Sequence, residues 1–172
     1  MLETINHSDV FALGPLTTKG FGSGGNPRIG RLAAKESSEQ FSKLLEGQDL
    51  VILTTGLGGG TGTGATPVLA SLAKKMGALV IVIATLPFNF EGQSRTQYAE
   101  KAVKSLIRSA DSLIEINNDG LLGSLDKKSN IDDSFKYADS ALEAIVEEIT
   151  TCLLYTSDAA EARSSVDLGG RR

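Results

Sequence analysis

The feature that most constrains this chain is a glycine-rich segment at residues 56–64, Gly-Leu-Gly-Gly-Gly-Thr-Gly-Thr-Gly. It follows an apolar run at 49–55, a predicted strand, and precedes a predicted helix at 65–76. Glycine lets the backbone approach a ligand closely, so successive N–H groups can point into one concavity. The positive end of the helix adds to this attraction, and Thr61 and Thr63 can donate hydroxyl hydrogen bonds. The segment therefore predicts a binding site for a di- or triphosphate.

Two familiar phosphate-binding motifs fit this segment less well. The P-loop pattern requires a lysine before Ser or Thr, and residues 56–64 contain no lysine. The dinucleotide fingerprint fits better, because residues 60–65 match Gly-x-Gly-x-x-Ala after a strand. That motif also requires an acidic residue at the end of the next strand, where this chain has Ile83-Ala84-Thr85-Leu86. An NAD(P)-binding enzyme domain therefore stays open as an alternative that lacks its acidic residue.

Predicted strands and helices alternate along the chain, which indicates an α/β fold with a parallel sheet. The predicted strands cover residues 10–13, 49–55, 78–85 and 112–116, and the predicted helices cover 27–46, 65–76, 91–108 and 132–150. The expected fold is a three-layer, Rossmann-like, mostly parallel sheet with helices on both faces. Ligands bind at the carboxyl ends of the strands in such sheets. A second glycine loop, at 20–26, also precedes a predicted helix and is expected at the same edge.

Composition narrows the possible functions. The 172 residues suffice for one α/β domain, and a net charge of -4 without a basic run argues against nonspecific nucleic-acid binding. With one cysteine and one histidine, an internal disulfide and a multi-histidine metal site are excluded, and no metal ligand is predicted. No apolar run reaches the ~18 residues of a membrane span, so direct membrane insertion is not expected.

The end of the chain differs from the rest. Residues 151–172 show no clean period and end in Gly-Gly-Arg-Arg. They resemble translated vector or sequencing-adapter sequence, so we expect a non-native or disordered tail. The predicted organisation is one partial nucleotide-binding domain at 1–150, followed by this tail.

Several segments in order resemble the tubulin/FtsZ family. They are Gly-Ser-Gly-Gly-Asn-Pro at 22–27, the uninterrupted Gly-Gly-Gly-Thr-Gly-Thr-Gly at 58–64, Pro-Phe-Asn-Phe-Glu-Gly at 87–92 with Arg95, Asn-Asp-x-Leu-Leu at 118–122, and Phe135 with Ala138-Asp139. The motif at 58–64 is specific by itself, and the resemblance covers about residues 10–150.

The resemblance implies which residues contact the phosphates. The diphosphate would be held by Gly58, Gly59, Gly60, Thr61, Gly62, Thr63 and Gly64. Gly24, Gly25 and Asn26 would face the terminal phosphate. The ordinary alternatives are a tight turn for the first set and a helix N-cap for Asn26.

The resemblance also implies the contacts to the sugar and the base. Glu91 and Arg95, four residues apart on one predicted helix face, would contact the sugar and the phosphate end; the alternative is a surface ion pair. Phe135 would cover one face of the purine. Asp139 would accept hydrogen bonds from guanine N1–H and the amino group, which selects GTP over ATP. The alternative is a core phenylalanine beside an exposed acid.

At the level of function, the resemblance implies GTP or GDP as ligand, with Mg²⁺ accompanying GTP. The parent protein would be a cytoplasmic, filament-forming GTPase of bacterial cell division. It would assemble head to tail at mid-cell, together with other division-machinery proteins, and would hydrolyse GTP at the subunit interface. A non-hydrolysing regulator or a membrane-remodelling relative is a further alternative.

The resemblance implies that this chain is a fragment. The family's first strand, a further glycine loop and the acidic catalytic loop are expected outside it. The sheet is therefore expected to be incomplete, and no catalytic residue is assigned. The fragment alone is expected not to hydrolyse GTP.

Overall fold

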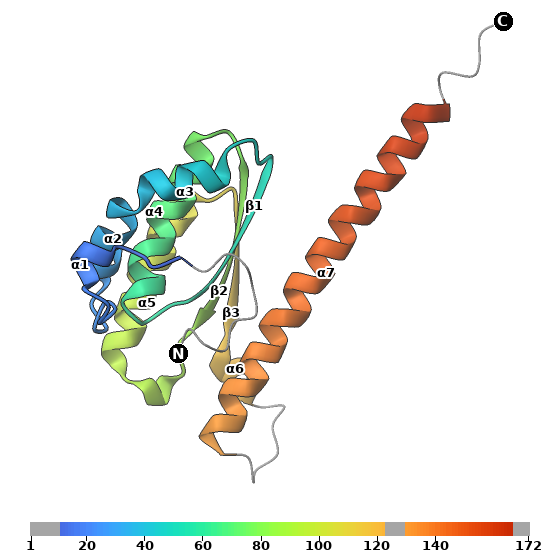
Figure 1. The fold of residues 1–172 in the computed structure, drawn as a ribbon. Helices are drawn as coiled ribbons and strands as arrows, with labels where there is room; N and C mark the ends of the chain where they lie inside the picture. The colour runs from blue at the N-terminus through green and yellow to red at the C-terminus, as the bar shows by residue number, and fades with distance from the viewer. Residues whose placement is uncertain (1–10, 123–129, 167–172) are drawn as a thin grey trace, which may run out of the picture. The chain divides into compact units, whose positions relative to one another are not determined.

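The computed structural model describes residues 11–122 and 130–166 (Figure 1). The chain divides into two compact units, Met1–Gly123 and Ser124–Arg172, and each is described by itself. The first unit contains the sheet and both glycine loops. The second contains one long helix.

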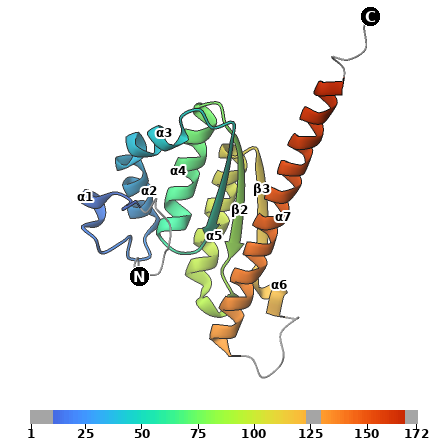
Figure 2. The ribbon, with the colours of Figure 1, turned by 45° about the vertical axis from the view of Figure 1, so that its right-hand side comes forward.

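Three parallel strands form the sheet of the first unit, in the order β1-β2-β3 (Figure 2). The strands are β1 (Leu50–Gly56), β2 (Leu79–Leu86) and β3 (Ser112–Asn117). In the central strand β2, the β-branched Val80, Val82 and Ile83 are completely buried, as expected for a strand with neighbours on both sides. Because all three strands run the same way, Gly56, Leu86 and Asn117 end at one edge of the sheet.

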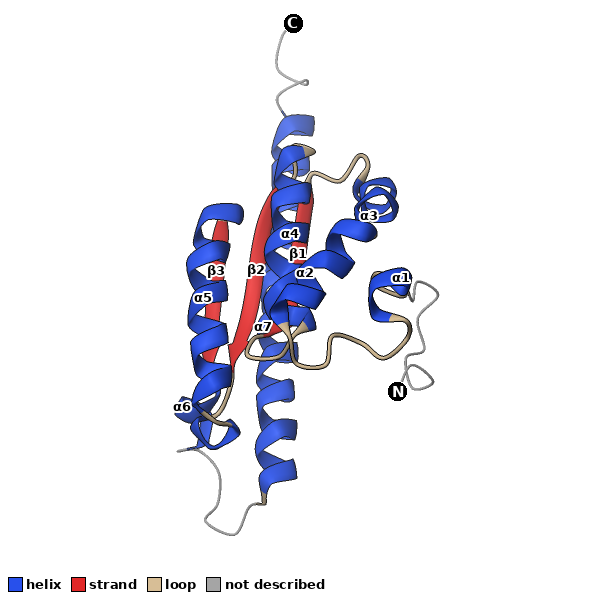
Figure 3. Ribbon diagram, turned by 90° about the vertical axis from the view of Figure 1, so that its left-hand side faces the viewer, coloured by secondary structure: helices blue, strands red, loops and turns tan. Residues whose placement is uncertain are grey.

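Most helices of the first unit lie over one face of this sheet (Figures 1 and 3). They are α1 (Pro15–Thr18), α2 (Pro27–Glu36), α3 (Ser38–Leu45), α4 (Thr61–Lys75) and α5 (Gln93–Ser109). The 3₁₀ turn η1 (Asn89–Glu91) precedes α5, and the short helix α6 (Asn118–Leu122) follows the end of β3. Helices α4 and α5 pack on the strands, and α2 packs on α4. Ala70 and Ala73 of α4 and Leu106 of α5 form a core with Val80 and Val82 of β2. The parallel α/β sheet is therefore confirmed, and the predicted second layer of helices stays a prediction.

Near the N-terminus the structure corrects a predicted strand. Residues 11–13 form no strand, and Val10 lies outside the described residues. Gly14 turns the chain with a left-handed φ of 55°, and its N–H donates to the hydroxyl oxygen of Ser37 at 2.8 Å. This contact between distant residues draws the segment onto α2 and away from the sheet.

The same serine interrupts a predicted helix. Instead of one helix over 27–46, the structure has α2 and α3, separated at Ser37. Ser37 is buried, and its hydroxyl accepts the Gly14 N–H. The periodicity of the apolar residues continues through the break, so only this tertiary contact reveals it.

Two further helices begin at residues other than those predicted. Helix α4 begins at Thr61 and not at Ala65, so the second half of the glycine segment forms its first turn. Helix α5 begins at Gln93 and not at residue 91, because Asn89–Glu91 form the 3₁₀ turn η1.

The second unit is α7 (Ile131–Val166). At its start, Asn130, which precedes the helix, and Asp133 of the first turn exchange hydrogen bonds: each backbone N–H donates to the other's side chain, at 3.1 and 2.9 Å. This reciprocal pairing satisfies free N–H groups at the helix start. The helix runs 16 residues beyond the predicted end at Thr150. The division into a domain at 1–150 and a foreign or disordered tail stays a prediction.

Candidate functional site

The loop after β1 leads into α4 with a row of free backbone donors. The N–H of Gly64 donates to Gly60 O at 3.1 Å, and the N–H of Gly58 donates to the hydroxyl oxygen of Thr63 at 2.9 Å. For the N–H groups of residues 59–63, no acceptor is found in the described part of the chain. The first N–H groups of a helix lack intrahelical partners and carry its positive end. Together these donors form a cradle for an anion, which we call the anion cradle.

The glycines of this segment have two different structural roles. A Cβ on Gly64 would strike the carbonyl oxygen of Pro27 and lie 2.7 Å from the nitrogen of Arg31, so Gly64 lets α2 and α4 cross closely. Added Cβ atoms at Gly60 and Gly62 would likewise strike neighbouring loop atoms. At Gly59, by contrast, nothing lies within 4 Å of an added Cβ. Gly59 therefore faces open space in the anion cradle, while the other three permit close packing.

The second glycine loop lies directly beside the first. The hydroxyl oxygens of Ser23 and Thr61 are 3.0 Å apart, and a Cβ on Gly60 would lie 2.6 Å from the nitrogen of Asn26. Gly24 and Gly25 are exposed and adopt left-handed φ values of 55° and 73°. The predicted phosphate residues of the two loops are thus brought together, although 38 positions separate Ser23 from Thr61.

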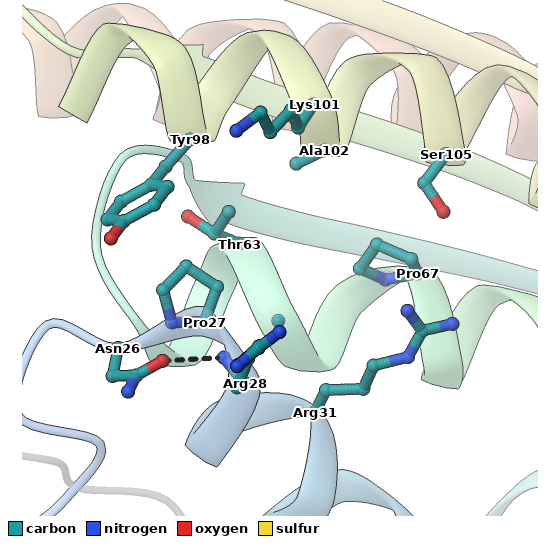
Figure 4. A pocket seen from close by; sticks show the side chains of 11 residues that line it. Asn26, Pro27, Arg28, Arg31, Thr63, Pro67, Tyr98, Lys101, Ala102 and Ser105 are labelled. Carbon is teal, nitrogen blue, oxygen red and sulfur yellow. Dashed lines mark hydrogen bonds between the residues drawn. The ribbon is translucent and has the colours of Figure 1, made fainter. Parts of the chain in front are cut away.

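In this structure Asn26 is the N-cap of α2, which was the alternative to phosphate binding for this residue. Its side-chain oxygen accepts the Arg28 N–H at 2.9 Å, which caps α2 (Figure 4). Pro27 follows at the first helical position, where a missing N–H costs nothing. The Asn26 amide nitrogen remains able to donate to a ligand.

The two threonines of the segment differ in exposure. Thr61 is exposed and shares a hydrogen bond with Ser23. Thr63 is buried, and its oxygen accepts from Gly58. Thr61 is therefore the more accessible hydroxyl.

Glu91 ends the 3₁₀ turn η1, Arg95 lies in the first turn of α5, and their side chains form an ion pair. The other carboxylate oxygen of Glu91 accepts the Phe88 N–H at 2.9 Å, which holds the loop after β2. Phe88 is completely buried and stacks on Phe90 with ring centres 4.8 Å apart. A Cβ on Gly58 would lie 3.2 Å from the Cβ of Arg95, so Arg95 stands next to the glycine loop. Both residues thus lie at the carboxyl edge of the sheet.

Asn118 was not among the predicted site residues. It follows β3 directly, is 6% exposed, and its Oδ1 has no hydrogen-bond partner within the described ranges. An unpaired buried polar atom costs free energy unless a ligand or water supplies a donor. Its position after a strand, at the edge that carries the glycine loop, was the signal that could have identified it.

Phe135 and Asp139 both belong to α7 and lie one turn apart. Both are exposed. They lie in the second unit, so their place at the base of a nucleotide stays a prediction.

The described residues also limit other kinds of site. Among the residues whose side chains the structure describes, no group of three or more His, Cys, Asp or Glu could hold a metal ion. None of the helices described is long and apolar enough to span a membrane.

Comparison with known proteins identifies the family of the domain that contains the candidate site. Residues 1–126 match the family described as Tubulin/FtsZ family, GTPase domain. The chain belongs to the tubulin/FtsZ family. This tubulin/FtsZ membership confirms the resemblance seen in the motifs. It does not favour the NAD(P) alternative.

Individual members of the tubulin/FtsZ family agree with the assignment. The cell division protein FtsZ of Pseudomonas aeruginosa is 47% identical over 149 residues, which are 87% of this chain and 38% of that protein. FtsZ of Azotobacter vinelandii is 45% identical, with the same two coverages. The chain thus spans about two fifths of the length of these relatives.

Solved structures agree in fold. An empty FtsZ dimer from M. jannaschii is 42% identical with a TM-score of 0.73, over 76% of this chain and 38% of that one. CetZ1 from Haloferax volcanii, a GDP-bound monomer, is 27% identical with a TM-score of 0.66, over 78% of this chain and 41% of that one. Three strands here, in a chain that covers two fifths of such a protein, agree with the predicted incomplete sheet.

Proposed function

We propose that this chain binds GTP and GDP at the carboxyl edge of its sheet. The observation that carries the proposal is the anion cradle, where the N–H groups of residues 59–63 have no acceptor in the described structure. Phosphate oxygens would supply those acceptors at the positive end of α4. The loop with Gly24, Gly25 and Asn26, which Ser23 joins to Thr61, would hold the terminal phosphate.

The remaining site residues would bind the nucleoside. Arg95 lies beside Gly58 and would approach the phosphate end, while Glu91 would contact the sugar. The buried Oδ1 of Asn118 would accept a hydrogen bond from the sugar or the base, which removes its unpaired state. Phe135 would stack on the purine and Asp139 would accept from the N1–H and amino group of guanine. Adenine has no such donor pair, so Asp139 would select GTP over ATP.

We further propose that the full-length protein is a GTPase of bacterial cell division that assembles head to tail into filaments. Its relatives are named cell division protein FtsZ, which supports a role in division. A solved FtsZ dimer supports self-association. An interface between unlike surfaces that does not close produces a filament. We expect division-machinery proteins as partners and a cytoplasmic location at mid-cell. Mg²⁺ would be held by the β- and γ-phosphates of GTP and would neutralise charge during hydrolysis. No catalytic residue is assigned in this chain.

Competition binding tests the nucleotide proposal. Fluorescent GTP is titrated with the 172-residue chain, and GTP, ATP and NAD are compared as competitors. GTP should displace the probe most strongly. Displacement by NAD in preference to GTP would transfer the site to the dinucleotide alternative.

A pair of acidic variants tests the base contact. Asp139→Ala should weaken GTP binding about tenfold or more, because a hydrogen bond to a charged group contributes about 1.5–3 kcal/mol. ATP binding should change little. Asp132→Ala, which removes an exposed carboxylate from the same helix, is the matched control and should leave both unchanged. Equal losses of GTP and ATP affinity in Asp139→Ala would reject the guanine assignment.

A further inference from the structure

A groove with only cations among its charged lining residues runs between α2, α4 and α5. A first cleft of about 520 Å³ and a second of about 380 Å³ share Arg31, Pro67 and Ser105, so they are continuous. Figure 4 shows the first cleft, with α4 between α2 and α5. The charged residues that line the two clefts are Arg28, Arg31, Lys74, Lys75, Lys101 and Arg108. We call this surface the basic groove.

The cations of the basic groove are largely uncompensated. Lys74 pairs with Asp111 at 2.6 Å. No other cation of the groove has a carboxylate within 4 Å in the described part of the chain. The groove is therefore positively charged, although the chain as a whole has a net charge of -4. Such a concentration attracts an anionic partner and steers its approach.

The shape of the groove favours a narrow chain. Its lining on α4 extends from Thr63 to Lys75, which is roughly 18 Å along a helix. That length accommodates about six residues of extended chain. Small residues, among them Ala102 and Ser105, line the groove between its cations. Pro27 and the ring of Tyr98 add apolar surface at the end near Asn26, and Pro67 adds it where the two clefts meet (Figure 4).

We propose that the basic groove binds an acidic peptide segment of a partner protein, with one apolar side chain seated near Tyr98 and Pro67. Carboxylates of the segment would pair with Arg31, Lys101 and Arg108. A flat anionic membrane would not reach the groove floor, and the net negative charge of the chain disfavours a long nucleic acid. The groove extends to the C-terminal end of α4, and its first cleft meets the candidate nucleotide site at Asn26, Thr63 and Gly64. The cations proposed to pair with the peptide belong to neither glycine loop, so this inference does not depend on GTP binding.

Fluorescence anisotropy with a defined peptide tests the proposal. The probe is a fluorescein-labelled peptide of about six glutamates with one central leucine, titrated with the 172-residue chain at low salt. Arg31→Gln combined with Lys101→Gln should weaken binding about tenfold, since each exposed pair contributes up to about 1 kcal/mol. The matched control is Lys35→Gln combined with Lys104→Gln. It changes the net charge equally on α2 and α5 but outside the groove, and should stay within about twofold.

Several outcomes would overturn the proposal. Equal losses in both double variants would mean nonspecific attraction, and an absence of parental binding would reject the site. Tighter binding to phosphatidylserine vesicles or to a single-stranded oligonucleotide than to the peptide would assign the groove to a membrane or a nucleic acid. All peptide titrations are made without nucleotide, and Gly59→Ala, which should weaken GTP binding, should leave peptide binding unchanged. Failure of the nucleotide proposal is thereby distinguished from failure of this one.

Discussion

The hydroxyl oxygens of Ser23 and Thr61 lie 3.0 Å apart and connect the two glycine loops of the candidate site. Ser23 is buried, whereas Thr61 is exposed at the first position of α4. The hydrogen bond thus fixes an exposed loop to the start of a helix that the core already holds. Its partners come from segments that no local sequence pattern connects.

Ser23→Ala should loosen the loop at 20–26 more than it destabilises the fold. A typical hydrogen bond contributes about 0.5–1.5 kcal/mol, so the free energy of unfolding should fall by about that amount. Amide hydrogen exchange should accelerate in residues 20–26, as measured by mass spectrometry. Ser42→Ala is the control, because that hydroxyl donates only within its own helix, at 2.9 Å. Unchanged exchange in Ser23→Ala would show that the bond does not restrain the loop.

Alanine at Gly64 and at Gly59 should have opposite consequences. At Gly64 the added methyl meets backbone of α2, so unfolding free energy should fall by about 1–3 kcal/mol, as in overpacked cores. At Gly59 the methyl enters open space, and stability should change by less than about 0.5 kcal/mol. GTP affinity should fall in Gly59→Ala, because the methyl occupies the anion cradle. Urea unfolding and GTP titration of both variants check this; a stable Gly64→Ala would contradict the packing role.

We expect the Thr63 hydroxyl to stabilise the fold, because its oxygen accepts the N–H of Gly58. Thr63→Val removes the acceptor of a buried N–H, which costs about 1–3 kcal/mol when nothing replaces it. Thr63→Ser keeps the oxygen and should restore most of the loss. Thermal or urea unfolding of both variants measures the difference. Equal stabilities of the serine and valine variants would show that the hydrogen bond contributes nothing.

Asp111 should make part of the stability depend on pH. A hydrogen bond from Lys74 and then one from the Val80 N–H lower the pKa of this carboxyl below its ordinary value. A lowered pKa in the folded state means that the stabilisation is present above the unfolded pKa of about 3.9. It is lost as pH falls through the folded pKa. Asp111→Asn should therefore lose less stability than the parent between about pH 6 and pH 2.5. Urea midpoints across this range give the test, and parallel curves would contradict it. Lys74→Gln should likewise make stability depend less on pH, because it removes the main hydrogen bond to Asp111.

Local patterns predicted the regular elements near the site well. Apolar, β-branched runs indicated the three strands within one or two residues, because a central parallel strand is buried on both faces. The glycine segment at 56–64 connects a strand to a helix as predicted, although the helix begins within it, at Thr61. Local patterns failed where a distant contact competes: the Gly14–Ser37 hydrogen bond replaced one predicted strand and divided one predicted helix.

Residue order and local spacing predicted the α/β alternation and the resemblance to the tubulin/FtsZ family, and from them we also infer the phosphate-binding role of the glycine segment. The folded arrangement was needed to show which glycines face open space and which let helices cross. It also revealed the unpaired Oδ1 of Asn118 and the cations gathered along α2, α4 and α5. These properties depend on distances between atoms far apart in the chain. Such distances are set by how helices pack on a sheet, and local periodicity carries no information about them.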